Sequence, residues 1–488
     1  MEKVAGMKEI ESLIASCRER NATFERAMGF TGSLRDFLML EKDRTLHNRS
    51  CEKLRTAEDY LECCGDYIAK RLGDNEAAET VEVLKLGAVN TADHHGGIYS
   101  SQSLQGDMLF GRMLKLLGSR DRCIPIFSFS EVELENTTYA RGLLNYGSRH
   151  RCLRFPLQPK KDMNRMMACC AGFDAEMAGR LDSFIAEAEE PDTVRKDVMR
   201  KVLKEVYRDP ALYEMPRYAD QCFFIARALS ERYFRDGAYP PHYYIEGEEA
   251  LLPLFEKELK DESSLIWHMF YDGKLRESMN RIRNEEGIPL AGLLLRGADD
   301  TGRRVNVQIR EDGVIEGMDR RRQLYSYASE PDALIRQLRE RKLLPGGYAI
   351  AVLTAFERGI CWYGGIFQSL YLPHWQALTV EALREAGLDR EAGIISAYDC
   401  GGYISGPVFA LAETPEGGAA CAGPFEFIEH PQKTDAFDKW MKLPVPETHI
   451  MGLFEIYNDL VPAAERQSDW YEKLCDFCAQ EYPGEVMK

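Results

Sequence analysis

At 488 residues, the chain is long enough for two or three domains, or for one large α/β domain with insertions. Its formal charge of -17 argues against broad binding to nucleic acid or anionic membranes, because phosphate contacts need clustered Lys and Arg. No run approaches the roughly 20 consecutive apolar residues of a membrane-spanning helix, and the first residues lack the apolar core of a secretory signal. We therefore expect a cytoplasmic protein, with no nucleic-acid or membrane partner, that acts on a small polar metabolite.

The 14 cysteines are scattered among apolar neighbours, a pattern typical of reduced and mostly buried thiols. Cys475 and Cys478 have the spacing of a metal-binding pair. No second pair or nearby His completes a tetrahedral zinc site around them. The cysteine pattern therefore assigns no metal ligands.

Residues 1–80 are expected to form a helical N-terminal region. Glu9 to Arg20 predicts a first helix. Thr56 is the predicted N-cap of a later helix, whose apolar face consists of Leu61, Cys64, Ile68 and Leu72. Gly73 is expected to end that helix.

Residues 81–160 are expected to form the first half of a Rossmann-like α/β core. The apolar runs Val81–Val89 and Cys123–Phe129 predict strands, and Gln102–Leu117 between them has helical spacing. A strand, a helix and a strand of these lengths predict a crossover that joins two parallel strands. Ligands bind at the carboxyl ends of such strands, where the polar segments 90–102 and 128–141 begin.

The spacing of apolar residues divides the rest of the chain into three regions. We expect a helical insertion that returns to the core in 161–285, more core with antiparallel strands in 286–430, and a helical region in 431–488. Alternating apolar residues and turn signals between Pro289 and Glu316 predict the antiparallel strands. The basic runs Arg320–Arg322 and Arg336–Lys342 are expected on a solvated helix face.

The turn after the first predicted strand holds the candidate catalytic residues Asp93, His94 and His95. Tyr99 and Gln102, which follow them, are predicted to bind the substrate. Two imidazoles beside a carboxylate can bind a metal, contact a phosphate or transfer protons near neutral pH. A capped turn with an exposed His is the alternative without a function. The triplet also resembles that of the metal-dependent phosphoesterases named for Asp-His-His, but the upstream strand-end aspartates of those enzymes have no counterpart here.

A second polar segment follows the second predicted strand. Glu131 and Glu133 are predicted to orient a substrate, and Arg141 is predicted to pair with a carboxylate or phosphate. Strand alternation leaves Glu135 and Asn136 as alternatives to the first two acids. A solvated acidic loop is the interpretation without a function.

A third segment contains Gly364 and Gly365 between aromatic residues, followed by Gln368 and Tyr371. A glycine pair lets the backbone approach a ligand closely while neighbouring rings cover it. All four residues are therefore predicted to bind the substrate.

The order of a strand, a polar turn with glycine, a helix and a strand ending in acids resembles the core of the bacillithiol-forming cysteine ligases. Residues 93–99 and 130–133 stand where that bacterial family has paired glutamines with glycines and a Tyr, and alternating acids with His. Histidines replace the paired glutamines here. The resemblance extends by order and texture through 224–237, 251–259 and 364–371. It implies a Rossmann-like core with an inserted helical region, and it leaves ATP or another nucleotide open as a cofactor.

Three functions follow. The leading hypothesis is a bacterial ligase or group-transfer enzyme in which His94 or His95 is a general acid/base or a phosphate contact. Such an enzyme could form a homo-oligomer. The second is a metal-dependent hydrolase that uses Asp93, His94 and His95. The third is a non-enzymatic binding or assembly subunit.

Overall fold

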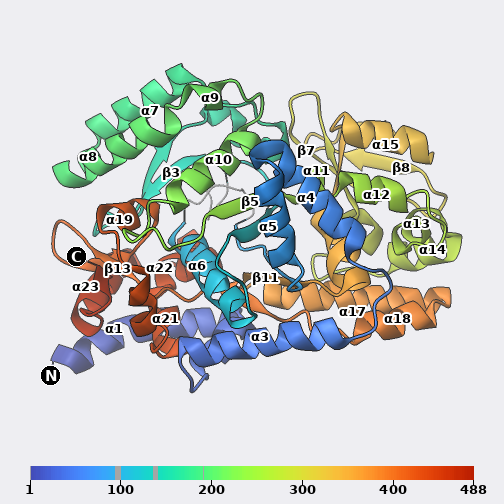
Figure 1. Cartoon of the computed structure of the whole chain (residues 1–488). Coiled ribbons are helices and arrows are strands. Elements are labelled where there is room, and N and C mark those ends of the chain that lie inside the picture. Colours follow the sequence, from blue (N-terminus) through green and yellow to red (C-terminus); the bar gives the residue numbers. More distant parts are fainter. Residues whose placement is uncertain (1, 94–99, 136–140, 191, 488) are drawn as a thin grey trace.

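A computed structural model describes residues 2–93, 100–135, 141–190 and 192–487 (Figure 1). Its centre is a five-stranded sheet in which every pairing is parallel. The strands are β1 (Ala88–Asn90), β2 (Ile124–Ser128), β5 (His242–Glu246), β11 (Cys361–Gly365) and β12 (Tyr403–Ser405).

The strand order is β12-β11-β1-β2-β5, so the chain adds strands first on one side of β1 and then on the other. This order is that of doubly wound sheets and is compatible with a Rossmann-like core. The order reverses between β1 and β11, and ligands of such sheets bind at this switch point, outside the carboxyl ends of the strands.

Both faces of the parallel sheet are covered. Every residue of β1, β2, β5 and β12 is buried, although successive side chains point to opposite faces. The helix α6 (Ser101–Leu116) packs on β2, β11 and β12, and Gly106 makes this approach close because a Cβ there would lie 2.9 Å from Ser405 Cβ. Continuous apolar strands are what a parallel sheet buried on both faces requires.

Helices precede the first strand over a slightly longer stretch than the sequence predicts. They are α1 (Glu2–Arg20), α2 (Ala22–Met28), α3 (Leu34–Ser50), α4 (Glu58–Leu72) and α5 (Asp74–Leu84). Gly73 ends α4 as predicted, but the N-cap is Ala57 and not Thr56. The strand predicted from Val81 begins only at Ala88, because Ala77, Thr80, Val83 and Leu84 are buried along one face of α5.

Between β2 and β11 the chain adds a hairpin, helices and a second sheet. The hairpin is β3 (Gly142–Asn145) and β4 (Leu153–Pro156). The helices before and after β5 are α7 (Ala175–Glu187), α8 (Thr193–Val202), α9 (Pro210–Tyr213), α10 (Tyr218–Ser230), α11 (Gly247–Ala250), α12 (Leu252–Glu258), α13 (Leu265–Tyr271) and α14 (Gly273–Arg281). The helices α13 and α14 meet at Asp272, which is the N-cap of α14.

The second sheet is antiparallel, in the order β10-β6-β7-β8-β9. Its strands are β6 (Leu295–Ala298), β7 (Arg304–Ile309), β8 (Ile315–Met318), β9 (Leu324–Tyr327) and β10 (Leu343–Pro345), with α15 (Pro331–Arg339) before β10 and α16 (Gly347–Ala351) after it. The alternation between Pro289 and Glu316 therefore predicts the sheet correctly. Arg320–Arg322 lie in the turn between β8 and β9 and not on a helix, because Gln323 and Asp319 close that turn by backbone pairing.

The chain closes with helices around a three-stranded sheet. The helices are α17 (Gln368–Ala386), α18 (Asp389–Ser396), α19 (Pro424–Glu429), α20 (Phe437–Trp440), α21 (Val445–Met451), α22 (Leu453–Leu460) and α23 (Trp470–Glu481), and the strands are β13 (Leu411–Glu413), β14 (Ala419–Cys421) and β15 (Val486–Met487). Buried apolar side chains from all five predicted segments form one continuous cluster. The segments therefore share a core.

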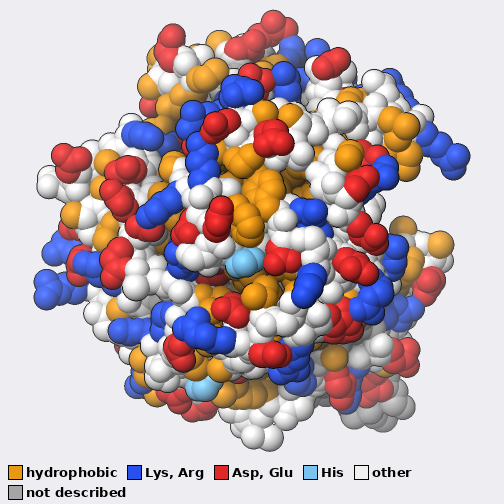
Figure 2. All heavy atoms as spheres, turned by 90° about the vertical axis from the view of Figure 1, so that its right-hand side faces the viewer, with side chains coloured by type: hydrophobic (Ala, Val, Ile, Leu, Met, Phe, Trp, Pro, Cys, Tyr) orange, Lys and Arg blue, Asp and Glu red, His pale blue; other side chains and the backbone are white. Residues whose placement is uncertain are grey.

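Figure 2 views the side of the molecule on which α12–α15 lie in Figure 1. Acidic and basic side chains are interspersed over this face, and no extended area carries one sign. None of the described helices combines the length and apolar character that crossing a bilayer requires.

Candidate functional site

The switch point brings together two of the predicted segments. Thr91 follows β1, and its backbone N–H donates to the Tyr363 carbonyl of β11 over 2.9 Å. The Thr91 hydroxyl donates to Gln368 Oε1 at the start of α17 over 2.7 Å, and the Tyr371 hydroxyl donates to the same oxygen over 3.2 Å. The Gln368 side chain is thus fixed by Thr91, which follows β1, and by Tyr371 of its own helix α17.

The other end of this amide is unsatisfied. Gln368 is 2% exposed, and its Nε2 has no hydrogen-bond partner among the described residues. Leaving a buried donor unpaired costs about 1–3 kcal/mol. The amide therefore offers a donor that a ligand oxygen would satisfy.

Gly364 has a specific steric role beside Gln368. A Cβ at Gly364 would lie 2.2 Å from Gln368 Oε1, whereas a Cβ at Gly365 would meet nothing closer than the Ser405 carbonyl at 3.9 Å. Gly364 therefore makes room for the Gln368 side chain, rather than for a ligand as the sequence predicts. Gly365 has no such constraint.

Two buried carboxylates, Asp93 and Asp107, lie near the carboxyl end of β1. The Tyr244 hydroxyl of β5 lies 3.0 Å from an Asp93 oxygen and 2.9 Å from an Asp107 oxygen, and Asn90 Nδ2 donates to Asp107 over 2.5 Å. Asp93 and Asp107 are fully buried. Burial, followed by the Asp93 carboxylate, raises the pKa of Asp107 well above its usual range. The direction of this shift favours the protonated form of Asp107.

His242 borders this cluster. Its Nδ1 lies 3.6 Å from Asp107 and its Nε2 is 2.6 Å from the Tyr239 hydroxyl. Burial lowers the pKa of His242 to about 3, so the imidazole is neutral.

The N-terminus of α6, where a doubly wound fold can bind phosphate, already holds a carboxylate. The backbone N–H groups of Ser101 and Gln102 donate to Glu455 of α22 over 3.1 and 2.8 Å, and the Tyr146 hydroxyl also donates to it. Negative charge is stabilised at a helix N-terminus. Gln102, a predicted ligand contact, therefore uses its backbone N–H within the protein.

Acids also gather at the carboxyl ends of β2 and β5. Glu248 accepts from the backbone N–H groups of Ser130 and Glu131 over 3.0 and 2.9 Å. Burial, then the Glu131 and Glu246 carboxylates, raises the pKa of Glu248 to about 8. This cluster joins the ends of two neighbouring core strands.

The three predicted charged residues of this region all have partners within the protein. Glu131 accepts from the Gly347 N–H over 2.5 Å and lies 3.0 Å from Arg296 Nε. Glu133 pairs with Arg320. Arg141 lies 2.7 Å from Glu135 and donates to the Gln158 carbonyl over 2.7 Å. Their contacts secure the 130–135 loop to the antiparallel sheet and to β4.

The carboxylates of Asp220, Glu246 and Glu249 lie within 4.8 Å of one another, close enough for a shared metal ion. Arginines neutralise them instead. Arg217 lies 2.8 Å from Asp220 and 2.9 Å from Glu246 and also pairs with Glu249, while Arg71 lies 2.8 Å from Asp220. The cluster is thus an ion-pair network.

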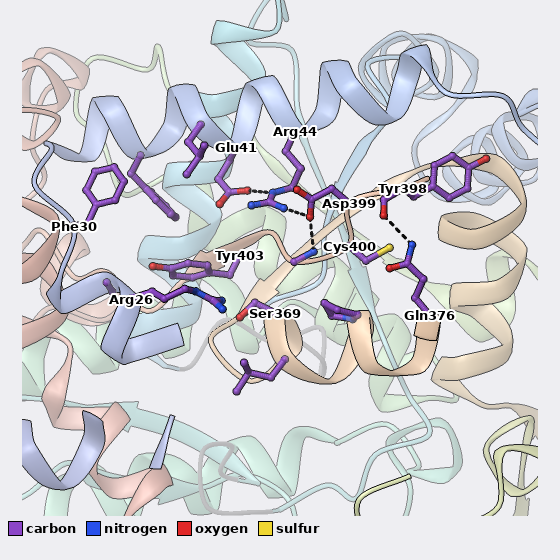
Figure 3. Close-up of a pocket in the computed structure, with 16 residues that line it drawn as sticks. Arg26, Phe30, Glu41, Arg44, Ser369, Gln376, Tyr398, Asp399, Cys400 and Tyr403 are labelled. Atoms are coloured by element: carbon purple, nitrogen blue, oxygen red, sulfur yellow. Dashed lines mark hydrogen bonds and ion pairs between the residues drawn. The ribbon is translucent and has the colours of Figure 1, made fainter. Parts of the chain in front are cut away.

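A cavity of about 690 Å³ lies between α3 and α17 (Figure 3). Arg44 pairs with Glu41 over 2.8 Å and also with Asp399, and the rings of Phe30 and Tyr403 lie on one side of this group. Burial raises the pKa of Glu41 to about 7, with Arg44 opposing the shift. Both carboxylates have a partner in Arg44, so the cavity lacks the unsatisfied group found at Gln368.

The remaining predicted site residues, His94, His95, Tyr99 and Asn136, lie outside the described residues. Sequence reasoning missed Thr91, Tyr244 and Glu248, although Thr91 stands directly after an apolar run, a position that signals a strand end. Comparison of the chain with protein-family models, with curated proteins and with solved structures gives no match.

Proposed function

We propose that this protein is a ligase or group-transfer enzyme with a Rossmann-like core, and that it binds a small polar metabolite at the β1–β11 switch point. The observation that carries the proposal is the buried Nε2 of Gln368, which has no hydrogen-bond partner among the described residues. A binding site commonly combines apolar walls with a few oriented polar groups, and this amide is one that Thr91 and Tyr371 orient at the switch point.

Each nearby group has a role in this proposal. Gln368 Nε2 donates to a carbonyl, carboxylate or hydroxyl oxygen of the metabolite, and Thr91 and Tyr371 fix the orientation of the amide. Asp93, held by Tyr244, is the carboxylate next in sequence to the predicted acid/base residues His94 and His95. Asp107 holds the proton that lets the two buried carboxyl groups lie side by side.

The proposal places no phosphate at the N-terminus of α6, because Glu455 accepts from the N–H groups that would bind it. Use of ATP or another nucleotide stays a prediction from the family resemblance. In the same way, a hydrolase that uses a metal at Asp93, His94 and His95 stays a prediction, because both histidines lie outside the described residues.

A thermal-shift screen tests the proposal. Amino acids, hydroxy acids, aminosugars and nucleotides are added separately to the wild-type protein, because a ligand of the folded state raises its stability by mass action. A stabilising metabolite is then tested on Gln368→Met, which removes the donor at similar volume, and on Gln323→Met, an exposed control. We expect stabilisation of the wild type and the control only.

Equal stabilisation of Gln368→Met would place the ligand elsewhere and overturn the assignment of the site. For a metabolite that passes, mass spectrometry after incubation with amino-acid and nucleotide co-substrates measures turnover. Binding without any new product would mean that the protein binds the metabolite but does not convert it. Metal analysis of the purified protein tests the hydrolase separately.

A further inference from the structure

We infer that the outer face of the antiparallel sheet is a binding site for a small organic anion, whose carboxylate or phosphate group pairs with Arg304 and Arg296. This inference does not depend on the function proposed for the switch point.

The strand β7 divides its side chains between two environments. Val305, Val307 and Ile309 are buried in the core, whereas Arg304, Asn306 and Gln308 alternate with them on the other face. Asn306 pairs in register with Arg296 of β6 on one side and with Met318 of β8 on the other. Side chains from three strands therefore share the outer face.

This face is hollowed. A cavity of about 290 Å³ is lined by the guanidinium-bearing residues Arg296 and Arg304, by Asn306 and Gln308, and by Pro289 and Met318. Its volume is near the lower limit of pockets that hold small molecules. The cavity therefore fits a small ligand and not a bulky one.

Within the described ranges, Arg304 is the arginine of this cavity that has no ion-pair partner. Among the described residues, Arg296 pairs with Glu131 over 3.0 Å and Arg320 pairs with Glu133, but no carboxylate lies within ion-pair distance of Arg304. The Nε of Arg304 is buried and has no hydrogen-bond partner in the described part of the chain. A cation in this position lacks the anion that its donors require.

The direction of the pKa shift of Arg304 agrees with its lack of a carboxylate partner among the described residues. Burial, followed by the neighbouring Arg296 guanidinium, lowers the pKa of Arg304, while Glu131 and Glu133 oppose the shift. Arg217 and Arg358, whose guanidinium groups are ion-paired, have raised pKa values. An anion bound at Arg304 would reverse the direction of its shift.

The lining also indicates the class of ligand. A guanidinium group binds carboxylate or phosphate oxygens through two parallel N–H groups. The side-chain amide of Asn306 and the Oε1 of Gln308 can bond hydroxyl or carbonyl-bearing groups of the same molecule. Gln308 Nε2 donates to Asn280 over 2.8 Å, and Glu316 pairs with Arg310 over 3.3 Å. These groups favour a small carboxylate or phosphate ester that also carries hydroxyl or carbonyl groups.

Isothermal titration tests the inference with two probes, inorganic phosphate and succinate, each at constant ionic strength set with sodium chloride. The full chain is compared with Arg304→Gln and with Arg120→Gln, which removes the same charge from an exposed position. We expect saturable binding of at least one probe to the wild type and to Arg120→Gln. Binding to Arg304→Gln should be weaker by about tenfold or more, the usual worth of a hydrogen bond to a charged group.

The probe that binds distinguishes the ligand: phosphate alone supports a phosphate ester, succinate alone a carboxylate, and both support their shared anionic chemistry. No saturable binding of either probe, or equal loss in both variants, overturns the inference. Circular dichroism checks that each variant folds, and Arg304→Lys, which keeps the charge, should retain part of the affinity if Arg304→Gln does not fold.

Discussion

Thr91 donates a hydrogen bond over 2.7 Å to Gln368, which lies 277 residues later in the chain. The bond joins the segments that follow two neighbouring core strands. The contact lies at the point where the order of the parallel strands reverses. It fixes one end of the Gln368 amide, whose other end has no hydrogen-bond partner among the described residues.

Gly364→Ala should disturb this arrangement, and Gly365→Ala should not. The new methyl group at position 364 would lie 2.2 Å from Gln368 Oε1 and displace the amide, whereas position 365 has no neighbour closer than 3.9 Å. We expect Gly364→Ala to abolish stabilisation by any metabolite found in the thermal-shift screen, and Gly365→Ala to retain it. The same response in both variants would separate the ligand from Gln368.

The stability of the protein should fall in acid because of His242. Its pKa is about 3 in the folded protein, against 6.5 ordinarily, so below pH 6.5 the unfolded chain binds a proton that the folded chain does not. This contribution is fully present above pH 6.5 and is lost as the pH falls toward 3. Urea denaturation from pH 7 to pH 4 should show a shallower loss for His242→Gln than for the wild type.

His449 provides the comparison. Burial lowers its pKa to about 4, so His449→Gln should also flatten the pH dependence, over a slightly narrower range. Wild-type slopes in both variants would mean that the two imidazoles are protonated in the folded protein.

Glu455→Ala should destabilise the protein by about 3 kcal/mol. The substitution leaves the N–H groups of Ser101 and Gln102 and the Tyr146 hydroxyl without their acceptor. Glu465→Ala is the control, since the exposed ion pair of Glu465 with Arg20 is worth at most about 1 kcal/mol. Chemical denaturation followed by circular dichroism measures both, and equal losses would contradict the role of Glu455 at α6.

Arg358→Met should cost about 3–5 kcal/mol, because it leaves buried carboxylates without their cation. Arg358 is 1% exposed and pairs with Glu258 and, over 3.1 Å, with Glu357. Converting both glutamates to Gln in the same chain should recover most of the loss. Arg339→Met, which breaks an exposed guanidinium's pair with Glu256, should cost less than about 1 kcal/mol in the same denaturation assay.

Local patterns in the sequence are sufficient to predict much of the fold. The apolar run at Cys123–Phe129 contains β2, because a strand buried on both faces is a continuous apolar run. Gln102–Leu117 nearly matches α6, because its apolar residues have helical spacing. The pattern places the start of β1 too early, because the β-branched residues of α5 favour a strand. In α5 the amphipathic spacing prevails over β propensity.

The candidate site was predictable in its position but only partly in its members. Parallel strands end at one edge of their sheet, so segments 90–102 and 364–371 had to lie close together. The ion pairs of Glu131 and Glu133 with arginines of the antiparallel sheet could not be foreseen, because they depend on how two sheets pack. Glu455 lies more than 350 residues from Ser101 and Gln102 and leaves no local signal.

The strand order also has a consequence for synthesis of the protein. The strand β1 forms near residue 90, but its neighbour β11 and the edge strand β12 leave the ribosome more than 270 residues later. At about 5–20 residues per second, one side of β1 stays without its partner for at least about ten seconds. An open strand edge can pair with other chains, so this nascent protein should need chaperone protection until β11 and β12 arrive.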